Sequence, residues 1–386
     1  MHSLGVRSRF TQGAIVGVVG LVGALLAVSA CSSPTTNQLP TVGNGPGDIP
    51  PTPDAGTGVT PPKADTGVAP PEDTGVAATD SAPDGPPPMM MTADTQWANG
   101  QQITGPTVIA AGVTITIAPG ATVTFASGAY LTISGTLSAA SSGETGAHAA
   151  LVGPASGTWG GLIVASGGTL SLDGVDITNA TTAIETQAGD LSAAYDNGTI
   201  EAANTPFQLD TGSSLTTSHA TVTGTIGEST VKGSFTASYL AYTKSASGEG
   251  IVAEDPTAIL SITDSTLTGS GPAGDMVVSD SAAQVNVAYT KITNVHCAFH
   301  FNGLSSFDIS YTTAETNAYG AMLYGSSGAG PFTIEHSNIE GNSVYALDEE
   351  GTNGTIVLEG SYVSGMSNVP GATSPQTSPI ANAGPR

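Results

Sequence analysis

The residue types best suited to chemistry lie in one short segment, His296-Cys297-Ala298-Phe299-His300. Imidazole and thiolate groups are common ligands of zinc, so this spacing first suggests a metal site. On a β-strand, however, side chains alternate between two faces. His296 and His300 would then share the outer face, where a weak zinc or copper site is conceivable. Cys297 would point inward, and we interpret it as a small buried hydrophobe.

Two acidic groups are the other candidates, Glu254-Asp255 and Asp348-Glu349-Glu350. Paired carboxylates can hydrolyse glycosides when they lie about 5 to 9.5 Å apart. The segment from Asp348 to Gly354 could instead hold calcium loosely, through carboxylates and turn carbonyls. Solvated turn charges are the simpler interpretation of both groups. If an outward groove is catalytic, the acidic residues to consider are Asp255, Asp280, Asp308, Glu335 and Asp348.

The elements that must position these residues belong to a repeat between Leu170 and Gly365. Apolar strand starts recur every 20 to 25 residues, at Leu170, Leu191, Leu215, Phe235, Leu260, Val285, Phe307, Phe332 and Ile356. Each unit is too short to bury its own apolar face, so the units must stack. The spacing therefore predicts a solenoid of β-strands.

Local patterns support strands and tight turns throughout this region. Val113-Thr-Ile-Thr-Ile117 alternates strictly and is closed by Ala118-Pro119-Gly120. An asparagine precedes an alanine by four residues in four repeats, at Asn179, Asn294, Asn317 and Asn342. Asparagine tolerates left-handed turns, and stacked amides can form a hydrogen-bonded ladder.

These motifs resemble the pectate-lyase-like superfamily of right-handed parallel β-helices. The resemblance rests on Ile117-x-Pro-Gly-x-x-Val-x-Phe125, on Trp159-Gly-Gly and on the asparagine ladder. It implies an all-β fold, a single-stranded right-handed parallel β-helix of about 11 coils. Trp159 is expected to pack over a coil edge, with stacking on a ligand as the alternative.

The superfamily's catalytic residues do not carry over to this chain. Pectate lyases would supply outer-face Asp ligands for calcium and an Arg base, and polygalacturonase-like members carry further Asp, His and Arg motifs. Residues 97–386 contain none of those motifs, and their only cationic side chains apart from histidine are Lys232, Lys244, Lys291 and Arg386. A polyuronate substrate would also meet a negative surface without cationic clamps.

The N-terminus has the features of an export signal. Arg7 and Arg9 precede an apolar stretch, Ala14 to Val28, that is short for a membrane span. It ends at Val28-Ser-Ala-Cys31, which looks like a bacterial lipobox. The resemblance implies cleavage before Cys31 and lipidation of that residue, which would anchor the protein without a spanning helix. Ser32 favours the outer membrane.

Four segments follow from these patterns. Residues 1–30 are predicted to be a lipoprotein signal peptide, and residues 31–95 a disordered Pro/Thr/Asp/Gly-rich linker after the lipidated Cys31. Residues 96–366 form the expected β-helix, and residues 367–386 a flexible C-terminal tail. Once Cys31 is lipidated, Cys297 is the one remaining cysteine, so an internal disulfide is not expected.

The net charge of −24 argues against nucleic acid and anionic membrane surfaces as partners. We expect a monomer that needs no cofactor, with calcium as an alternative. The leading hypothesis is a cell-surface lipoprotein whose β-helix is a rigid scaffold or an adhesin-like, glycan-binding module. The alternative is a carbohydrate-active enzyme, a lyase or glycoside hydrolase acting on non-uronate glycan. Candidate glycan contacts are Trp159, Asp255, Asp308 and Glu335.

Overall fold

The computed structural model describes residues 87–140, 146–225, 227–244, 248–302, 305–324, 332–350, 356–369 and 374–386. All of them belong to the second of two compact units, Asp80–Arg386. The predicted signal peptide, Cys31 and most of the predicted linker lie outside the described residues. Among the described residues, no helix is long and apolar enough to cross a membrane.

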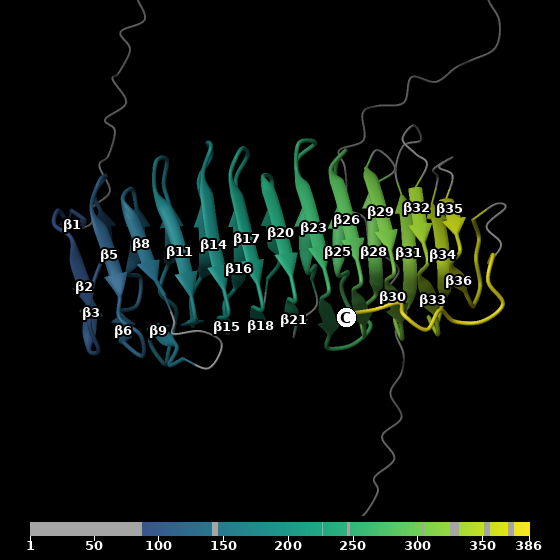
Figure 1. Ribbon diagram of the computed structural model, residues 1–386, viewed down its shortest axis with the longest axis horizontal. Coiled ribbons are helices and arrows are strands. Elements are labelled where there is room, and N and C mark those ends of the chain that lie inside the picture. The colour runs from purple at the N-terminus through teal and green to yellow at the C-terminus, as the bar shows by residue number, and fades with distance from the viewer. Residues whose placement is uncertain are drawn as a thin grey trace, which may run out of the picture. The chain divides into compact units, whose positions relative to one another are not determined.

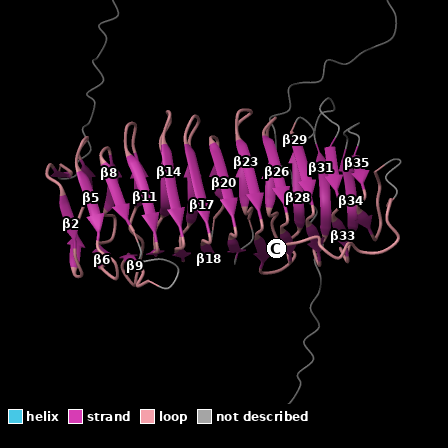
Figure 2. Ribbon diagram, in the orientation of Figure 1, coloured by secondary structure: helices cyan, strands magenta, loops and turns pink. Residues whose placement is uncertain are grey.

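The second unit is a right-handed parallel β-helix, as the repeat predicts (Figure 1). The described residues form three parallel sheets of twelve strands each, and every third strand in chain order joins the same sheet. One rung therefore contributes one strand to each sheet. The strands stack in chain order, and Figure 2 shows strands and connecting loops without helices in the drawn part. At about 4.8 Å per rung, twelve rungs extend over roughly 50 Å.

We name the sheets A, B and C, in the order in which each rung visits them. Sheet A contains β1 (Met89–Met91), β4 (Thr107–Ile109), β7 (Tyr130–Ile133), β10 (Gly161–Val164), β13 (Thr182–Thr186), β16 (Thr205–Leu209), β19 (Ser229–Val231), β22 (Ile251–Ala253), β25 (Val277–Ser279), β28 (Cys297–Asn302), β31 (Tyr319–Tyr324) and β34 (Tyr345–Glu350). Sheet B contains β2 (Thr95–Trp97), β5 (Thr114–Ile117), β8 (Thr136–Ala139), β11 (Thr169–Asp173), β14 (Ser192–Asp196), β17 (Ser214–Ser218), β20 (Ser234–Ser238), β23 (Ile259–Thr263), β26 (Gln284–Ala288), β29 (Ser306–Ser310), β32 (Phe332–Glu335) and β35 (Ile356–Glu359). Sheet C contains β3 (Gln101–Ile103), β6 (Thr122–Phe125), β9 (Ala149–Val152), β12 (Val175–Thr178), β15 (Thr199–Glu201), β18 (Thr221–Thr225), β21 (Ala241–Lys244), β24 (Thr266–Gly269), β27 (Lys291–Thr293), β30 (Thr313–Glu315), β33 (Asn338–Glu340) and β36 (Tyr362–Val363).

The first strand begins at Met89, before the expected domain start at residue 96. The β1 segment pairs in parallel with β4, so these residues already belong to the first rung. Their apolar side chains, three methionines in a row, do not alternate, which is why the sequence pattern does not identify them as a strand.

The corner between sheets B and C turns on a single left-handed residue. The non-glycine residues with positive φ at this corner are Asn197, His219, Tyr239, Asp264, Tyr289, Tyr311 and His336. A buried hydroxyl often follows: Ser337 Oγ accepts a hydrogen bond from the Thr312 backbone N–H, and Ser361 Oγ accepts one from Ser337. Each bond joins one rung to the next, so this ladder ties the corners together along the β-helix.

The predicted asparagine ladder lies at a second corner, between sheets C and A. Asn179 and Asn294 have φ near +57°, at 56° and 58°, as left-handed turns require. Asn317 and Asn342 act through their side chains instead. The Asn342 Oδ1 accepts a bond from the Asn317 backbone N–H at 3.2 Å, and the Asn317 Oδ1 accepts one from Val295 at 3.2 Å. Asn179 combines the two roles, because its Nδ2 also donates a 3.2 Å hydrogen bond to the Pro154 carbonyl of the preceding rung.

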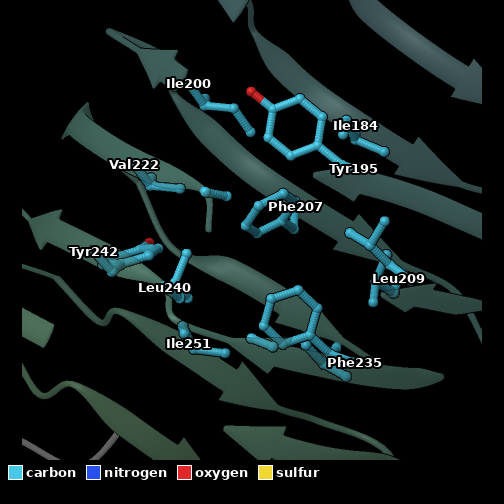
Figure 3. Packing of buried hydrophobic residues seen from close by; sticks show 14 of the residues in the cluster. Ile184, Tyr195, Ile200, Phe207, Leu209, Val222, Phe235, Leu240, Tyr242 and Ile251 are labelled. Carbon is cyan, nitrogen blue, oxygen red and sulfur yellow. The ribbon is translucent and has the colours of Figure 1, made fainter. Parts of the chain in front are cut away.

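The core runs along the inside of the three sheets as one continuous cluster of buried side chains. Figure 3 shows its centre, where Phe207, Phe235 and Tyr242 point inward from different strands. The rings of Phe207 and Phe235 lie 5.2 Å apart. Tyr195 is also buried, and its hydroxyl donates a hydrogen bond to the Val175 carbonyl at 2.8 Å. Stacking, and not any single rung, supplies the apolar burial that stabilises the fold.

Residues 374–386 lie against the β-helix. The Gly384 N–H donates a hydrogen bond to the Tyr311 carbonyl, and the Ile380 N–H donates one to Asn338 Oδ1. The Arg386 guanidinium lies 3.4 Å above the Tyr289 ring and contacts Asp264 at 3.2 Å. These contacts do not measure motion, so the predicted flexibility of this C-terminal segment stays a prediction.

Candidate functional site

The residues of the His-Cys-His segment meet a fourth residue, Asp275, on the outer side of sheet A. Asp275 lies just before β25, in the turn that leads from sheet C into sheet A. His296 occupies the same turn one rung later, and Cys297 and His300 belong to β28. Parallel stacking thus brings together residues from two neighbouring rungs. We call Asp275, His296, Cys297 and His300 the Asp-His-Cys-His cluster.

The prediction that Cys297 points into the core is wrong, although its burial is confirmed at 0% exposure. Strict alternation fails at the start of the sheet A strands. Ala298 and Phe299 both belong to the core cluster, which does not include Cys297. Two successive inward residues turn Cys297 to the same side as His300. Ligand atoms of Asp275, Cys297 and His300 consequently lie within 4.8 Å of one another.

Asp275 is the centre of the cluster. Its Oδ1 lies 3.0 Å from the Nδ1 of His296 and accepts a 2.9 Å hydrogen bond from the Cys297 backbone N–H. Its Oδ2 contacts the Nδ1 of His300. The side chains of Asp275, His296 and His300 are only 9%, 17% and 15% exposed. The carboxylate is therefore held by hydrogen bonds on both oxygens in a nearly buried position.

Opposing effects act on the pKa of Asp275. Burial alone would raise the pKa, because it disfavours the charged form. Hydrogen bonds from His296 and His300, the charge of His300 and the Cys297 contact outweigh burial. The net result is a pKa well below the usual range for aspartate. Asp275 is thus an ionised carboxylate at neutral pH.

The cluster does not have the geometry of a thiol nucleophile. The Cys297 sulfur lies 3.2 Å from the Nδ1 of His296, the same ring nitrogen that contacts Asp275. A nucleophilic triad needs the two partners on opposite ring nitrogens, so that the imidazole can move a proton between them. The sulfur is also completely buried. A role as a ligand or as a packing group fits better.

More ionisable groups surround the cluster along sheet A. Burial, followed by the charges of Asp280, Glu228 and Asp275, raises the pKa of Glu249 from 4.5 to about 7. The Tyr324 hydroxyl donates a 2.6 Å hydrogen bond to Asp280 Oδ1, and burial together with this bond raises the pKa of the phenol well above its usual range. Both shifts reflect burial and the concentration of carboxyl groups on this side of the β-helix.

One cation is buried in the same region. Lys244 is 1% exposed, and its Nζ donates hydrogen bonds to the carbonyls of Gly248 and Ala273, the latter at 3.3 Å. Burial lowers its pKa, while the charges of Asp275 and Glu249 act in the opposite direction. The carbonyls fix the ammonium group in the turn beside the cluster, where it offsets part of the negative charge.

The raised pKa of Glu249 predicts a pH-dependent stability. Below pH 4.5 both the folded and the unfolded chain hold the proton. Between pH 4.5 and 7 the unfolded chain releases it first, so stability falls as the pH rises, and the loss is complete above pH 7. Glu249→Gln should raise the free energy of unfolding at pH 8 by about 1 to 2 kcal/mol, after discounting for partial exposure, and change little at pH 4.

Urea unfolding of the metal-free protein at both pH values measures this effect. Asp308→Asn removes a carboxyl group at an exposed position on sheet B and is the matched control, which should change stability by less than about 0.5 kcal/mol. An equal change at pH 4 and pH 8 for Glu249→Gln would contradict the assignment.

The other predicted site residues are dispersed. Asp255 lies in the turn after β22, where its carboxylate accepts bonds from the Thr257 N–H and hydroxyl, which lower its pKa. Asp308 and Glu335 lie on β29 and β32 of sheet B. Of the acidic residues expected in a groove, Asp280 is the one placed beside the cluster.

Trp159 is buried at 0% exposure and stacks on Phe125, with ring centroids 3.9 Å apart. Its Nε1–H donates a 3.0 Å hydrogen bond to the Thr178 carbonyl. These contacts confirm the expected packing at a coil edge and leave no ring face for a glycan.

The group Asp348-Glu349-Glu350 forms the end of β34. Asp348 is 3% exposed and accepts hydrogen bonds from the Glu349 backbone N–H and from the Asn368 side chain. Asn368 Oδ1 also accepts a 2.7 Å bond from Glu349 N–H. These bonds tie the last rung to the chain that follows it. Calcium binding here stays a prediction, and the following residues 351–355 lie outside the described part.

Sequence inspection missed Asp275 and Glu249. Neither belongs to a recognisable motif, because their partners lie in other rungs. The repeat period was the available signal: Asp275 precedes Cys297 by 22 residues, which is one rung. Glu249 stands one rung earlier, since the Gly250 N–H bonds the Asp275 carbonyl.

Comparison of the chain with family models, with curated proteins and with solved structures finds no match. The parallel β-helix itself is established by the strand pairing described above.

Proposed function

We propose that this chain is a lipid-anchored surface protein of the bacterial envelope whose β-helix is a rigid, non-catalytic scaffold or glycan-binding module. The observation that carries this proposal is the unbroken stack of twelve rungs around one core. A solenoid of this kind offers long, regular outer faces whose spacing is set by the backbone. Such faces suit recognition of an extended partner such as a polysaccharide.

The N-terminal sequence supports the proposed location in the bacterial envelope. A basic start, an apolar stretch and the lipobox-like Val28-Ser-Ala-Cys31 together suit export and acylation. The Pro-rich, polar composition that follows suits a spacer between the membrane and the β-helix. Ser32 after the cysteine suits the outer membrane. The partners in this proposal are the membrane, through Cys31, and a surface polysaccharide.

Anchoring through Cys31 makes a direct prediction. In bacteria that produce the full chain, labelled palmitate should mark the wild-type protein, and the protein should sediment with membranes. Cys31→Ala should abolish labelling and move the protein into the soluble fraction, because no acyl chain holds it. Cys297→Ala is the matched control, since it removes the other cysteine and leaves the lipobox intact. A Cys31→Ala protein that remained in the membrane fraction would contradict anchoring through a lipid on Cys31.

Glycan binding is tested by applying the full chain to an array of neutral, acetylated and acidic glycans. The strongly negative surface leads us to expect binding of neutral or acetylated chains and none of polyuronates. Asp308→Ala and Glu335→Ala, both on sheet B, test that face. If the protein binds no glycan on the array, the glycan-binding part of the proposal is wrong and only the scaffold role stands.

A second candidate function is a carbohydrate-active enzyme, and the surroundings of Glu249 favour it. A carboxyl group with a pKa of about 7 can act as a general acid at neutral pH, and ionised carboxylates lie nearby. The test is incubation of the purified chain with non-uronate polysaccharides, with Glu249→Gln as the inactive control. Cleavage by the wild-type chain that disappears in Glu249→Gln would show that the protein is this enzyme and that the non-catalytic scaffold hypothesis is wrong.

A further inference from the structure

We propose that the Asp-His-Cys-His cluster binds one divalent transition metal ion of the zinc class, with Asp275, Cys297 and His300 as ligands and His296 as the fourth. The site goes beyond the scaffold function, and its test is independent of it.

The distances within the cluster suit a tetrahedral ion. With metal–nitrogen and metal–sulfur bonds of about 2.0 to 2.3 Å, neighbouring ligand atoms in a tetrahedron lie about 3.3 to 3.8 Å apart. Here Asp275 Oδ1 and Cys297 Sγ lie 3.0 and 3.2 Å from the Nδ1 of His296. Ligand atoms of Asp275, Cys297 and His300 all fall within 4.8 Å of one another. Small side-chain shifts would therefore open room for an ion between them.

The chemistry of the donors selects the kind of metal. One thiolate, two imidazoles and one carboxylate form a mixed sulfur, nitrogen and oxygen set, which suits zinc and its transition-metal neighbours. Calcium and magnesium prefer six or more oxygen ligands, and the cluster offers a single carboxylate. A bound thiolate and a carboxylate also carry two negative charges, which match the two positive charges of the ion.

The surroundings favour a cation over an empty cluster. Asp280 adds a negative charge on this side of the β-helix, and Glu249, whose pKa is about 7, adds part of one. Lys244, the one buried lysine among the described residues, offsets only part of this charge. The cluster is almost closed to water, since Cys297 is 0% exposed and His300 is 15% exposed. Electrostatic attraction is stronger where water is excluded, so an ion at this position gains more than it would at an open acidic surface.

The two parts of the site are also held rigidly. The Cys297 N–H donates to Asp275 Oδ1, and the Met276 N–H donates to the Cys297 carbonyl at 2.9 Å. These bonds join two neighbouring rungs just before the paired residues of β25 and β28, and they fix Asp275 against Cys297 before any ion arrives. A preformed arrangement of this kind lowers the ordering that binding would otherwise require.

The experiment is a zinc titration of the purified full chain, freed of metal by chelator and kept reduced, in competition with a chromophoric chelator. We expect one tight site per chain. Cobalt is the second probe, because a cobalt ion with a thiolate ligand absorbs in the near ultraviolet. Cys297→Ser should abolish this band and weaken zinc binding about 100-fold or more, as should His300→Ala, since loss of a ligand exceeds the tenfold to 100-fold effect of losing an outer contact.

His148→Ala is the matched control. His148 contacts Asp176 with an Nδ1–Oδ1 distance of 3.1 Å, which is an Asp–His pair without a cysteine or a second histidine. Its loss should leave the tight site unchanged. Cys31 is present in every variant, so its contribution cancels. Far-ultraviolet circular dichroism verifies that each variant keeps the β-helix.

Three results would overturn the proposal. One is the absence of a saturable site in the wild-type chain. Another is zinc binding of equal strength in folded Cys297→Ser and His300→Ala proteins, which would place the ion on the acidic surface. The third is a cobalt complex without a thiolate band. If Cys297→Ser fails to fold, Asp275→Asn, which keeps the side-chain shape, serves as the second ligand variant.

Discussion

Phe235→Ala should lower the free energy of unfolding by about 4 kcal/mol, because it leaves a cavity that the surrounding strands cannot close. Phe235 is completely buried on β20, and its neighbours above and below in sheet B are Leu215 and Leu260. Its ring lies 5.2 Å from that of Phe207 (Figure 3). Backbone pairing fixes the rung spacing, so the core cannot collapse into the space.

The position of Phe235 in the stack adds a second expectation. It belongs to the seventh of twelve rungs, whereas Trp97 and Trp159 lie near the N-terminal end. Solenoids lose cooperativity when an internal rung is weakened. Urea unfolding followed by tryptophan fluorescence should therefore separate from unfolding followed by circular dichroism. Ile259→Ala, on the exposed side of β23 at 41% exposure, is the control and should change stability by less than about 0.5 kcal/mol.

A Phe235→Ala protein as stable as the control would contradict the view that stacked apolar side chains hold the β-helix together. Coincident unfolding by both probes would instead show that the twelve rungs melt as one unit.

The sequence predicts the fold well because one physical constraint decides it. Units of 20 to 25 residues with strands too short to bury themselves can only be stable when stacked. The inward residues Phe235, Leu260 and Val285 were identified by this repeat, and their strands pair in register. The start at Met89 could not be predicted, because its strand does not alternate.

The candidate site was predicted in part. His296, Cys297 and His300 were identified as possible ligands from their residue types. The direction of Cys297 was wrong, because period-two alternation does not allow for Ala298 and Phe299 both facing the core. Asp275 was missed because parallel stacking, and not sequence proximity, brings it to Cys297. Sites that span rungs require the register of the repeat, which a single motif does not contain.

Gly161→Ala should destabilise the protein by more than about 4 kcal/mol, which is beyond the range of ordinary substitutions. Gly161 begins β10 with φ at +104°, a conformation that residues with a Cβ rarely adopt. A Cβ at this position would lie 1.5 Å from the Thr182 carbonyl oxygen of the next rung. That oxygen is part of the backbone, so relief of the overlap would require the two rungs to separate.

Gly167→Ala in the same rung separates the steric clash from the backbone strain. Gly167 also has a positive φ, +79°, but a Cβ there would meet no atom within 4 Å. This control should cost about 1 to 2 kcal/mol, the usual penalty of left-handed backbone. Thermal melting of both variants measures the difference, and failure of Gly161→Ala alone to fold would agree with it. Equal losses in the two variants would mean that the rungs at β10 and β13 adjust to a side chain, and that close backbone contact does not fix their spacing.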